Sequence, residues 1–176
     1  MANHLNDISK HHPDLVIQVL SKWLNQSTGE NTKKILWITH RALRTLIKKG
    51  YPPALKLIGV NGRAKADMGE FKIRKKDLKL NEKLSFSFAL QSRSRKTQKI
   101  VIDYKIHFVK SNGTLSPKVY KLKTLNLKPN ETIQISKEHS LKKITTMQYY
   151  SGRHYLEIQI NGENFGKIPW NFKLPK

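Results

Sequence analysis

Five side chains between Lys33 and Lys48 combine positive charge with one large aromatic ring. They are spaced four, four, three and four residues apart, so a helix would place them on one face: Lys33, Trp37, Arg41, Arg44 and Lys48. Lysine and arginine neutralise phosphates, and an indole can stack on a base or pack against a sugar. The row therefore predicts contact with a nucleic-acid backbone. The alternative is a solvated basic face with the indole packed against a neighbouring helix.

Asp7 is the candidate catalytic residue. Asn3, Asp7 and Lys10 share one face of an expected helix. In stacked helix pairs the equivalent helices line one surface, which would place Asp7 beside Arg41 and Arg44. A carboxylate on a phosphate-binding surface can stabilise the positive charge that develops when an N-glycosidic bond to a cationic alkylated base breaks. The alternative is a structural aspartate that forms an ion pair with one of the two arginines.

A second group of cations lies between two expected strands, where a loop tip is predicted. Its members are Arg93, Arg95 and Lys96, and loop tips carry many binding residues. The alternative is a surface whose charge serves solubility. Three histidines near the N-terminus, His4, His11 and His12, lack the spacing of metal ligands. We expect no metal and no cofactor.

The charge of the whole chain favours a polyanionic partner. It carries 34 Lys and Arg against 12 Asp and Glu, a formal net charge of +22, which favours nucleic acid first and an anionic membrane second. With no cysteine there is no disulfide and no cysteine nucleophile. The N-terminus lacks the apolar core of a secretory signal, and no apolar run reaches membrane-spanning length. We expect a cytoplasmic, nucleoid-associated protein that binds no membrane.

The elements that must position these residues change character near Gly59. Before it, apolar spacing predicts helices over residues 3–10, from Pro13, over residues 32–49 and from Pro52. The second helix carries an apolar stripe of Leu15, Val16, Val19, Leu20, Trp23 and Leu24. The third ends at a C-cap glycine, Gly50, and carries four apolar residues opposite the cations: Leu36, Leu43, Leu46 and Ile47.

The helices also suggest a repeat. Leu5 and Ile8 precede Leu43 and Leu46 by 38 residues, and paired helices with a period of about 40 are typical of HEAT-like solenoids. So few repeats cannot bury a continuous core, so we expect a fragment or a solenoid end that docks on something else. The alternative is a four-helix cap on the domain that follows.

After residues 60–69, expected to be a linker, the sequence predicts only strands. Leu84, Phe86, Phe88 and Leu90 alternate with small residues, which predicts one buried and one wet face. The apolar residues from Ile100 to Phe108 alternate in the same way with Asp103, Lys105 and His107. About seven short strands are typical of an immunoglobulin-like sandwich. The predicted fold is α+β with two domains: a short α-helical HEAT-like repeat segment (1–59) and, after the linker, an all-β immunoglobulin-like sandwich (70–176).

Three segments resemble a known family. ANHLNDISKHHPDL and WITHRALRTLIKKGYPPALKLIG are similar to the end of the helical domain of AlkC-type DNA glycosylases, in the DNA alkylation repair HEAT-like superfamily. ITTMQYYSGRHYLEIQINGE resembles the immunoglobulin-like domain that some members append. The resemblance implies removal of cationic alkylated bases, chiefly 3-methyladenine, from double-stranded DNA. It also implies that the lesion lies on a concave helical surface without a deep flipping pocket.

Carried over residue by residue, Asp7 matches an active-site carboxylate position of the family. Either Arg41 or Arg44 matches a DNA-contacting arginine. The resemblance also implies that the sandwich reaches the DNA, which adds three basic residues of the family-like stretch as candidates: Lys142, Lys143 and Arg153. The earlier helical repeats of the family, with further acidic and aromatic residues, have no counterpart in this sequence.

The sequence therefore predicts the C-terminal portion of a DNA-3-methyladenine glycosylase that binds duplex DNA mainly through backbone phosphates. Because the earlier repeats of the family have no counterpart here, we expect this chain to be an incomplete glycosylase. One alternative is a non-catalytic DNA-binding module built from a helical cap and a basic sandwich. Another is a basic sandwich that binds an acidic protein or a membrane surface.

Overall fold

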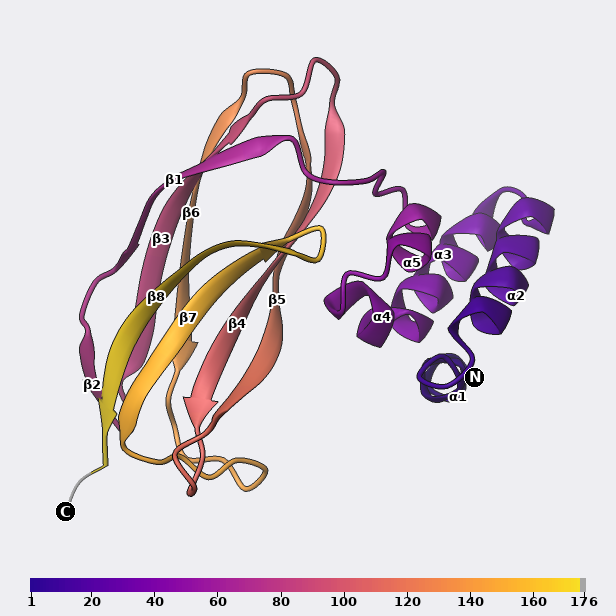
Figure 1. The fold of residues 1–176 in the computed structure, drawn as a ribbon. Coiled ribbons are helices and arrows are strands. Elements are labelled where there is room, and N and C mark those ends of the chain that lie inside the picture. The colour runs from indigo at the N-terminus through magenta and orange to yellow at the C-terminus, as the bar shows by residue number, and fades with distance from the viewer. Residues whose placement is uncertain (175–176) are drawn as a thin grey trace. The chain divides into compact units, whose positions relative to one another are not determined.

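Helices come first in the chain and strands follow in the computed structural model, which describes residues 1–174 (Figure 1). The chain divides into two units. We call the first the helical unit; it comprises Met1–Arg63 together with the short segment Asn161–Glu163. We call the second the sandwich; it comprises Ala64–Ile160 and the chain from Asn164 onward. The predicted order of helices before strands is confirmed.

Short helices build the helical unit. They are α1 (Ala2–Ile8), α2 (Pro13–Gln26), α3 (Glu30–Ala42), α4 (Arg44–Lys48) and α5 (Pro52–Leu57). Proline stands at the first turn of α2 and of α5, where its missing N–H costs no hydrogen bond. The first helix ends two residues before the predicted end at Lys10.

The helix predicted over residues 32–49 is interrupted at Leu43, and a side chain from α1 explains the break. The backbone N–H of Thr45 donates to Asn6 Oδ1 at 3.2 Å, and the carbonyl of Arg41 accepts from Arg44 Nη1 at 3.3 Å. In a continuous helix those two backbone groups would pair with each other. A side chain inserted into the hydrogen-bond ladder is a known cause of helix kinks. Asn6 is therefore the reason that α3 and α4 are separate helices.

Two glycines end α4 and α5 in the same way. Gly50 has φ of +71°, Gly50 N donates to the carbonyl of Ile47, and Tyr51 N donates to the carbonyl of Leu46. This is the Schellman arrangement, which requires a left-handed residue that glycine adopts without strain. Gly59, with φ of +82°, repeats it after α5. The predicted C-cap at Gly50 is confirmed.

The predicted apolar stripes hold only in part. Val16 and Leu20 are buried on α2, but Leu15 is 55% exposed. Leu43, Leu46 and Ile47 are buried, but Leu36, predicted to share their side, is 38% exposed next to Trp37. The prediction for Leu15 and Leu36 was wrong because each lies at the margin of a stripe, where helical spacing alone does not decide which side chain is covered.

Eight strands form the sandwich within the described residues. They are β1 (Ala66–Ile73), β2 (Asp77–Lys79), β3 (Lys83–Ser92), β4 (Gln98–Val109), β5 (Leu115–Leu127), β6 (Thr132–Ser140), β7 (Gly152–Ile160) and β8 (Glu163–Lys173). One sheet has the order β1-β3-β6 and the other β2-β8-β7-β4-β5. The chain therefore changes sheets between β1 and β2. β1 also begins inside the range expected to be the linker.

The core lies between these two sheets. Along β3, buried residues alternate with partly exposed ones, so Leu84, Phe86, Phe88 and Leu90 face inward as predicted. On β4 the predicted apolar residues are also buried, but the alternation appears only from Tyr104 to Phe108, because Ile100 to Tyr104 are buried without a break. Asp103, which the alternation placed on the wet side, is only 2% exposed. His154 is buried in this core, and its ring stacks on Trp170 at 4.7 Å between centroids.

Candidate nucleic-acid interface

The cation row of α3 and α4 is fully exposed despite the break at Leu43. All five of its side chains are exposed: Lys33, Trp37, Arg41, Arg44 and Lys48. Trp37 keeps 61% of its surface accessible, which contradicts the alternative in which the indole packs against a neighbouring helix. The guanidinium carbon of Arg41 lies 5.5 Å from the centroid of the indole ring, within the range of a cation–π interaction.

Arg44 connects this row to α1. Its Nη1 donates to Asn3 Oδ1 at 3.0 Å and to the carbonyl of Arg41 at 3.3 Å. The guanidinium is therefore held at the point where α1 meets the start of α4. Arg41 and Arg44 differ in their surroundings, because one lies over an indole and the other is fixed by an amide and a carbonyl. The planar guanidinium of each can donate two hydrogen bonds to the oxygens of one phosphate.

Asp7 lies one helical turn after Asn3, on the face of α1 that Arg44 contacts. Its carboxylate forms an ion pair with Lys10 at 2.7 Å, and both side chains are largely exposed. The hydrogen bond and charge of Lys10, with a smaller contribution from Arg44, hold the pKa of Asp7 below its ordinary value. The carboxylate is therefore ionised at neutral pH. Its ion-pair partner is Lys10, one helical turn away, and not Arg41 or Arg44 as the structural alternative proposed.

Asn6 is the positioning residue of this site that the sequence analysis did not single out. It is 2% exposed, and its Oδ1 accepts from both the backbone N–H and the hydroxyl of Thr45, at 3.2 and 2.9 Å. Ser9, also buried, donates to the carbonyl of Asn6 at 2.8 Å. A polar residue adjacent to Asp7 on an otherwise exposed helix was the available signal. The role of Asn6 is visible only in its contact with Thr45 at the start of α4.

The loop between β3 and β4 carries the first group of sandwich cations. Arg93, Arg95 and Lys96 are exposed there, as predicted for a loop tip. Arg93 forms an ion pair with Asp67 of β1. Its backbone N–H donates to the carbonyl of Lys65 at 2.8 Å, so this loop lies at the end of the sandwich where the chain enters β1.

The second group of sandwich cations lies at the other end. Strand β3 runs antiparallel to β6, with Gln91 opposite Thr132 and Lys83 opposite Ser140. The loop that follows β3 and the loop that follows β6 are therefore at opposite ends of the sheet, separated by about 30 Å for a nine-residue strand. Lys142, Lys143 and Arg153 are all exposed at the β6–β7 end. The structure does not bring the two basic groups together.

A second aromatic residue with two cations, which the sequence did not indicate, lies near that end. The guanidinium of Arg153 is 5.8 Å and the ammonium of Lys167 is 4.9 Å from the centroid of the Tyr155 ring. Tyr155 pairs in register with His107 of β4, whose Nε2 lies 3.0 Å from Glu157 Oε2. The arrangement repeats the Trp37 and Arg41 pairing on a different scaffold.

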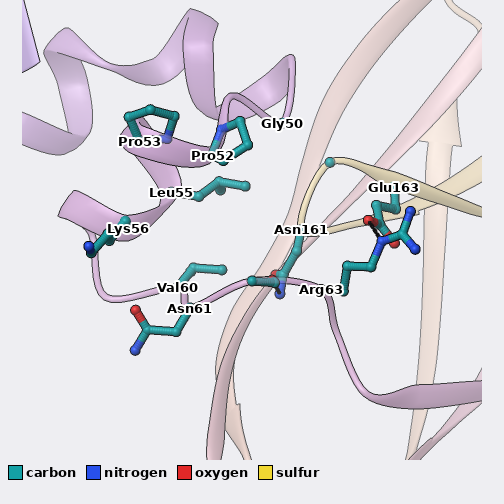
Figure 2. A pocket seen from close by; sticks show the side chains of 12 residues that line it. Gly50, Pro52, Pro53, Leu55, Lys56, Val60, Asn61, Arg63, Asn161 and Glu163 are labelled. Carbon is teal, nitrogen blue, oxygen red and sulfur yellow. Dashed lines mark hydrogen bonds and ion pairs between the residues drawn. The ribbon is translucent and has the colours of Figure 1, made fainter. Parts of the chain in front are cut away.

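The helical unit also contains a cavity of about 840 Å³ (Figure 2). Its lining includes Pro52, Leu55 and Val60, and the ion pair between Arg63 and Glu163. None of the predicted site residues lines it. Residues 1–174 contain no helix that is long and apolar enough to cross a membrane. Across the same residues, no cluster of three or more potential His, Cys, Asp or Glu ligands could hold a metal ion.

Known proteins resemble this chain over nearly its whole length. The structure of the alkylpurine DNA glycosylase AlkC from Pseudomonas fluorescens, bound to DNA containing an abasic site analog, superposes with a TM-score of 0.90 at 36% identity. The match covers 98% of this chain and 46% of that one. The protein YhaZ of Bacillus subtilis is 39% identical over 163 residues, which are 93% of this chain and 44% of that protein. This chain thus spans less than half the length of both relatives.

More distant likenesses concern the fold alone. A β-glucosidase from Listeria innocua is 17% identical, with a TM-score of 0.50 over 64% of this chain and 17% of the enzyme. The match to AlkC confirms the resemblance that the sequence segments carry. Residues 67–174 match the family described as the C-terminal Ig-like domain of the uncharacterised protein YhaZ, which confirms the immunoglobulin-like sandwich. Because that match covers more than half of its residues, the chain belongs to the YhaZ C-terminal Ig-like domain family.

Proposed function

We propose that this chain is the C-terminal portion of a DNA alkylation-repair glycosylase. In this proposal the helical unit is the end of a HEAT-like repeat and forms a domain separate from the sandwich. The chain binds duplex DNA at the nucleoid, mainly through backbone phosphates. The observation that carries the proposal is the likeness to the DNA-bound AlkC over 98% of this chain. The exposed row of cations with Trp37 supports the same partner.

The binding experiment measures the salt dependence of duplex affinity by fluorescence anisotropy. The logarithm of the association constant should fall linearly with the logarithm of salt concentration, and each lost phosphate contact should reduce that slope by about 0.9. Arg41→Ala and Arg44→Ala should each reduce the slope. Lys56→Ala, an exposed lysine of α5 outside the row, is the matched control. A shallow slope for the unaltered chain would contradict DNA binding through phosphates.

Within this function Asp7 contributes to excision of a cationic alkylated base such as 3-methyladenine. Its pKa is below the ordinary value, so the carboxylate stays anionic when the glycosidic bond breaks. A permanent negative charge suits stabilisation of the developing cation better than proton donation. Candidate DNA contacts outside the row are the basic residues at the two ends of the sandwich: Arg93, Arg95, Lys96, Lys142, Lys143 and Arg153.

The excision experiment measures release of 3-methyladenine from methylated duplex DNA. It should be run on this chain and on a protein extended by the helical part that the relatives have. Asp7→Asn should reduce release with affinity unchanged or raised, because the substitution removes a charge that repels phosphate. Asp14→Asn is the matched control, since Asp14 accepts a hydrogen bond from Tyr51 on the same unit. Equal release by Asp7→Asn and the unaltered protein removes Asp7 from the site.

The second candidate function is a DNA-binding module without catalysis. The short coverage of AlkC, 46% of its chain, favours it, because residues elsewhere in a glycosylase can be required for excision. Release of 3-methyladenine by neither the chain nor the extended protein, with steep salt dependence retained, would establish this alternative.

A further inference from the structure

Lys10 is attached to Asp7 through both its backbone and its side chain. The backbone N–H of Lys10 donates to the carbonyl of Asp7 at 3.2 Å, and its ammonium nitrogen lies 2.7 Å from Asp7 Oδ1. Ser9, directly before Lys10, is 0% exposed, and its hydroxyl donates to the carbonyl of Asn6 at 2.8 Å. The turn that ends α1 is therefore anchored on its buried side, and the Lys10 side chain starts from a fixed position beside the carboxylate.

Lys10 and Arg44 affect this carboxylate to different degrees. The hydrogen bond and charge of Lys10 lower the pKa of Asp7 more than the charge of Arg44 does, and Arg44 donates instead to Asn3 and to the carbonyl of Arg41. The Lys10 side chain keeps 46% of its surface accessible, and the Asp7 side chain keeps 61%. An ion pair so exposed is weak, because water screens it. Lys10 can therefore leave the carboxylate at little cost when another cation takes its place.

A carboxylate on a surface that binds DNA needs a counterion. An unpaired Asp7 would repel the phosphates that the exposed cation row is proposed to bind. The ammonium of Lys10 offsets this charge as long as the ion pair is intact. A cationic alkylated base carries a positive charge of its own, so it can replace the ammonium beside the carboxylate. A neutral base has no such charge and leaves the ion pair in place.

We propose that Lys10 is a built-in counterion of Asp7, which shields the carboxylate from the phosphates of undamaged DNA and is displaced by the positive charge of a lesion. This inference rests on the proposed function, because it assumes that Asp7 faces the lesion in bound duplex. It makes Lys10 a residue that sets how the site distinguishes cationic from neutral bases. A lysine that only binds a phosphate would contribute equally to every duplex, whatever base the duplex carries.

The experiment compares three duplexes of one sequence by fluorescence anisotropy. One carries a cationic pyrrolidine abasic analogue, one carries a neutral tetrahydrofuran analogue, and one is undamaged. Lys10→Ala should weaken binding to the neutral and undamaged duplexes and raise the preference for the cationic duplex over the neutral one by about twofold, the size expected of an exposed ion pair. Lys10→Arg retains the charge and should restore the original preference. Lys56→Ala, at an exposed lysine of α5, is the matched control and should leave the preference unchanged.

Two further measurements assign the effect to the ion pair itself. In a protein that already carries Asp7→Asn, Lys10→Ala should no longer change the preference, since such a double-mutant cycle isolates the coupling between the two residues. Nuclear magnetic resonance of the free chain should show that Lys10→Ala raises the pKa of Asp7 toward its ordinary value, because the hydrogen bond and charge of Lys10 lower it. An unchanged pKa of Asp7 overturns the proposal, because the ion pair would then be absent in solution.

The possible outcomes separate this proposal from the proposed function. Absence of duplex binding by the unaltered chain overturns both. Duplex binding without any preference for the cationic analogue removes Asp7 from the lesion site and overturns the counterion, while DNA binding stands. A preference that Asp7→Asn abolishes and Lys10→Ala leaves unchanged overturns only the counterion. Equal weakening of all three duplexes by Lys10→Ala also overturns it, because that result identifies a plain phosphate contact. Equal thermal midpoints for the variants, expected for exposed residues, exclude misfolding as the cause.

Discussion

The helical unit and the sandwich display their cations in different ways. On α3 and α4, the five residues from Lys33 to Lys48 are spaced by three or four and are all exposed, which is what helical spacing predicts. On the sandwich, the two basic groups lie on loops at opposite ends of the same sheet. Which cations lie close together therefore depends on helical periodicity in the helical unit and on strand topology in the sandwich.

The two units also differ in what holds them in shape. The sandwich has a cluster of twenty buried hydrophobic residues between its sheets. The helical unit exposes several large apolar side chains, among them Leu15, Leu36 and Trp37. Its short helices depend on particular polar and backbone contacts, such as Asn6 with Thr45. The comparison predicts that single substitutions act through volume in the sandwich and through backbone contacts in the helical unit.

The largest expected effect is the loss of a core ring from the sandwich. Phe88 is 1% exposed and meets Phe71 edge to face at 6.1 Å. Phe88→Ala should reduce the free energy of unfolding by about 3–5 kcal/mol through lost burial and a cavity. The exposed ring of Trp37 in the helical unit is the control. Trp37→Ala should change the free energy of unfolding by less than about 0.5 kcal/mol. Urea unfolding measures both, and equal losses would contradict the contrast between the units.

Gly50→Ala should have the next largest effect. A methyl group at Gly50 would lie 2.4 Å from the Cα atom of Gly162, a backbone atom that cannot rotate away. The left-handed φ adds a cost of about 1–2 kcal/mol, so we expect a loss of unfolding free energy above that amount. Gly113, with φ of +78° and no atom within 4 Å of an added methyl group, is the control that carries only the backbone cost. Thermal unfolding compares the two, and an equal loss would show that the contact with Gly162 is not restrictive.

Asn6→Ala should cost about 1–2 kcal/mol, because it removes the acceptor for the Thr45 N–H at the start of α4. Hydrogen exchange at the Thr45 amide should become faster, since the local structure opens more easily. Asn3→Ala, which removes only an exposed hydrogen bond to Arg44, should cost less than about 0.5 kcal/mol. If exchange at Thr45 is the same in both variants, Asn6 does not hold the break between α3 and α4.

The effect that is smallest at neutral pH, and grows only in acid, is a pH dependence of the sandwich. Burial lowers the pKa of His139 to about 4, below its ordinary value of 6.5. Between these values the unfolded chain binds a proton that the folded chain does not, so the free energy of unfolding should fall as pH falls from about 7 to about 4. His139→Gln should flatten that part of the profile, measured as urea midpoints against pH. Parallel profiles for both proteins would show that the ring carries its charge when folded.

The sequence determined the local structure of this protein, because periodicity and capping act over a few residues. It predicted helices before strands, the C-cap at Gly50, the inward faces of β3 and β4, and the exposed cation row. It also carried the resemblance to AlkC. It missed the break at Leu43, because that break depends on Asn6, which lies 39 residues away from Thr45.

Tertiary structure decided everything that depends on distant segments meeting. It placed the Arg93 loop and the Lys142 loop at opposite ends of the sandwich, because β3 and β6 run antiparallel. It paired Asp7 with Lys10 and kept Trp37 in solvent. Which side chains are covered, and which cations share a surface, follows from contacts that close only when the whole chain has folded, and no local pattern encodes them.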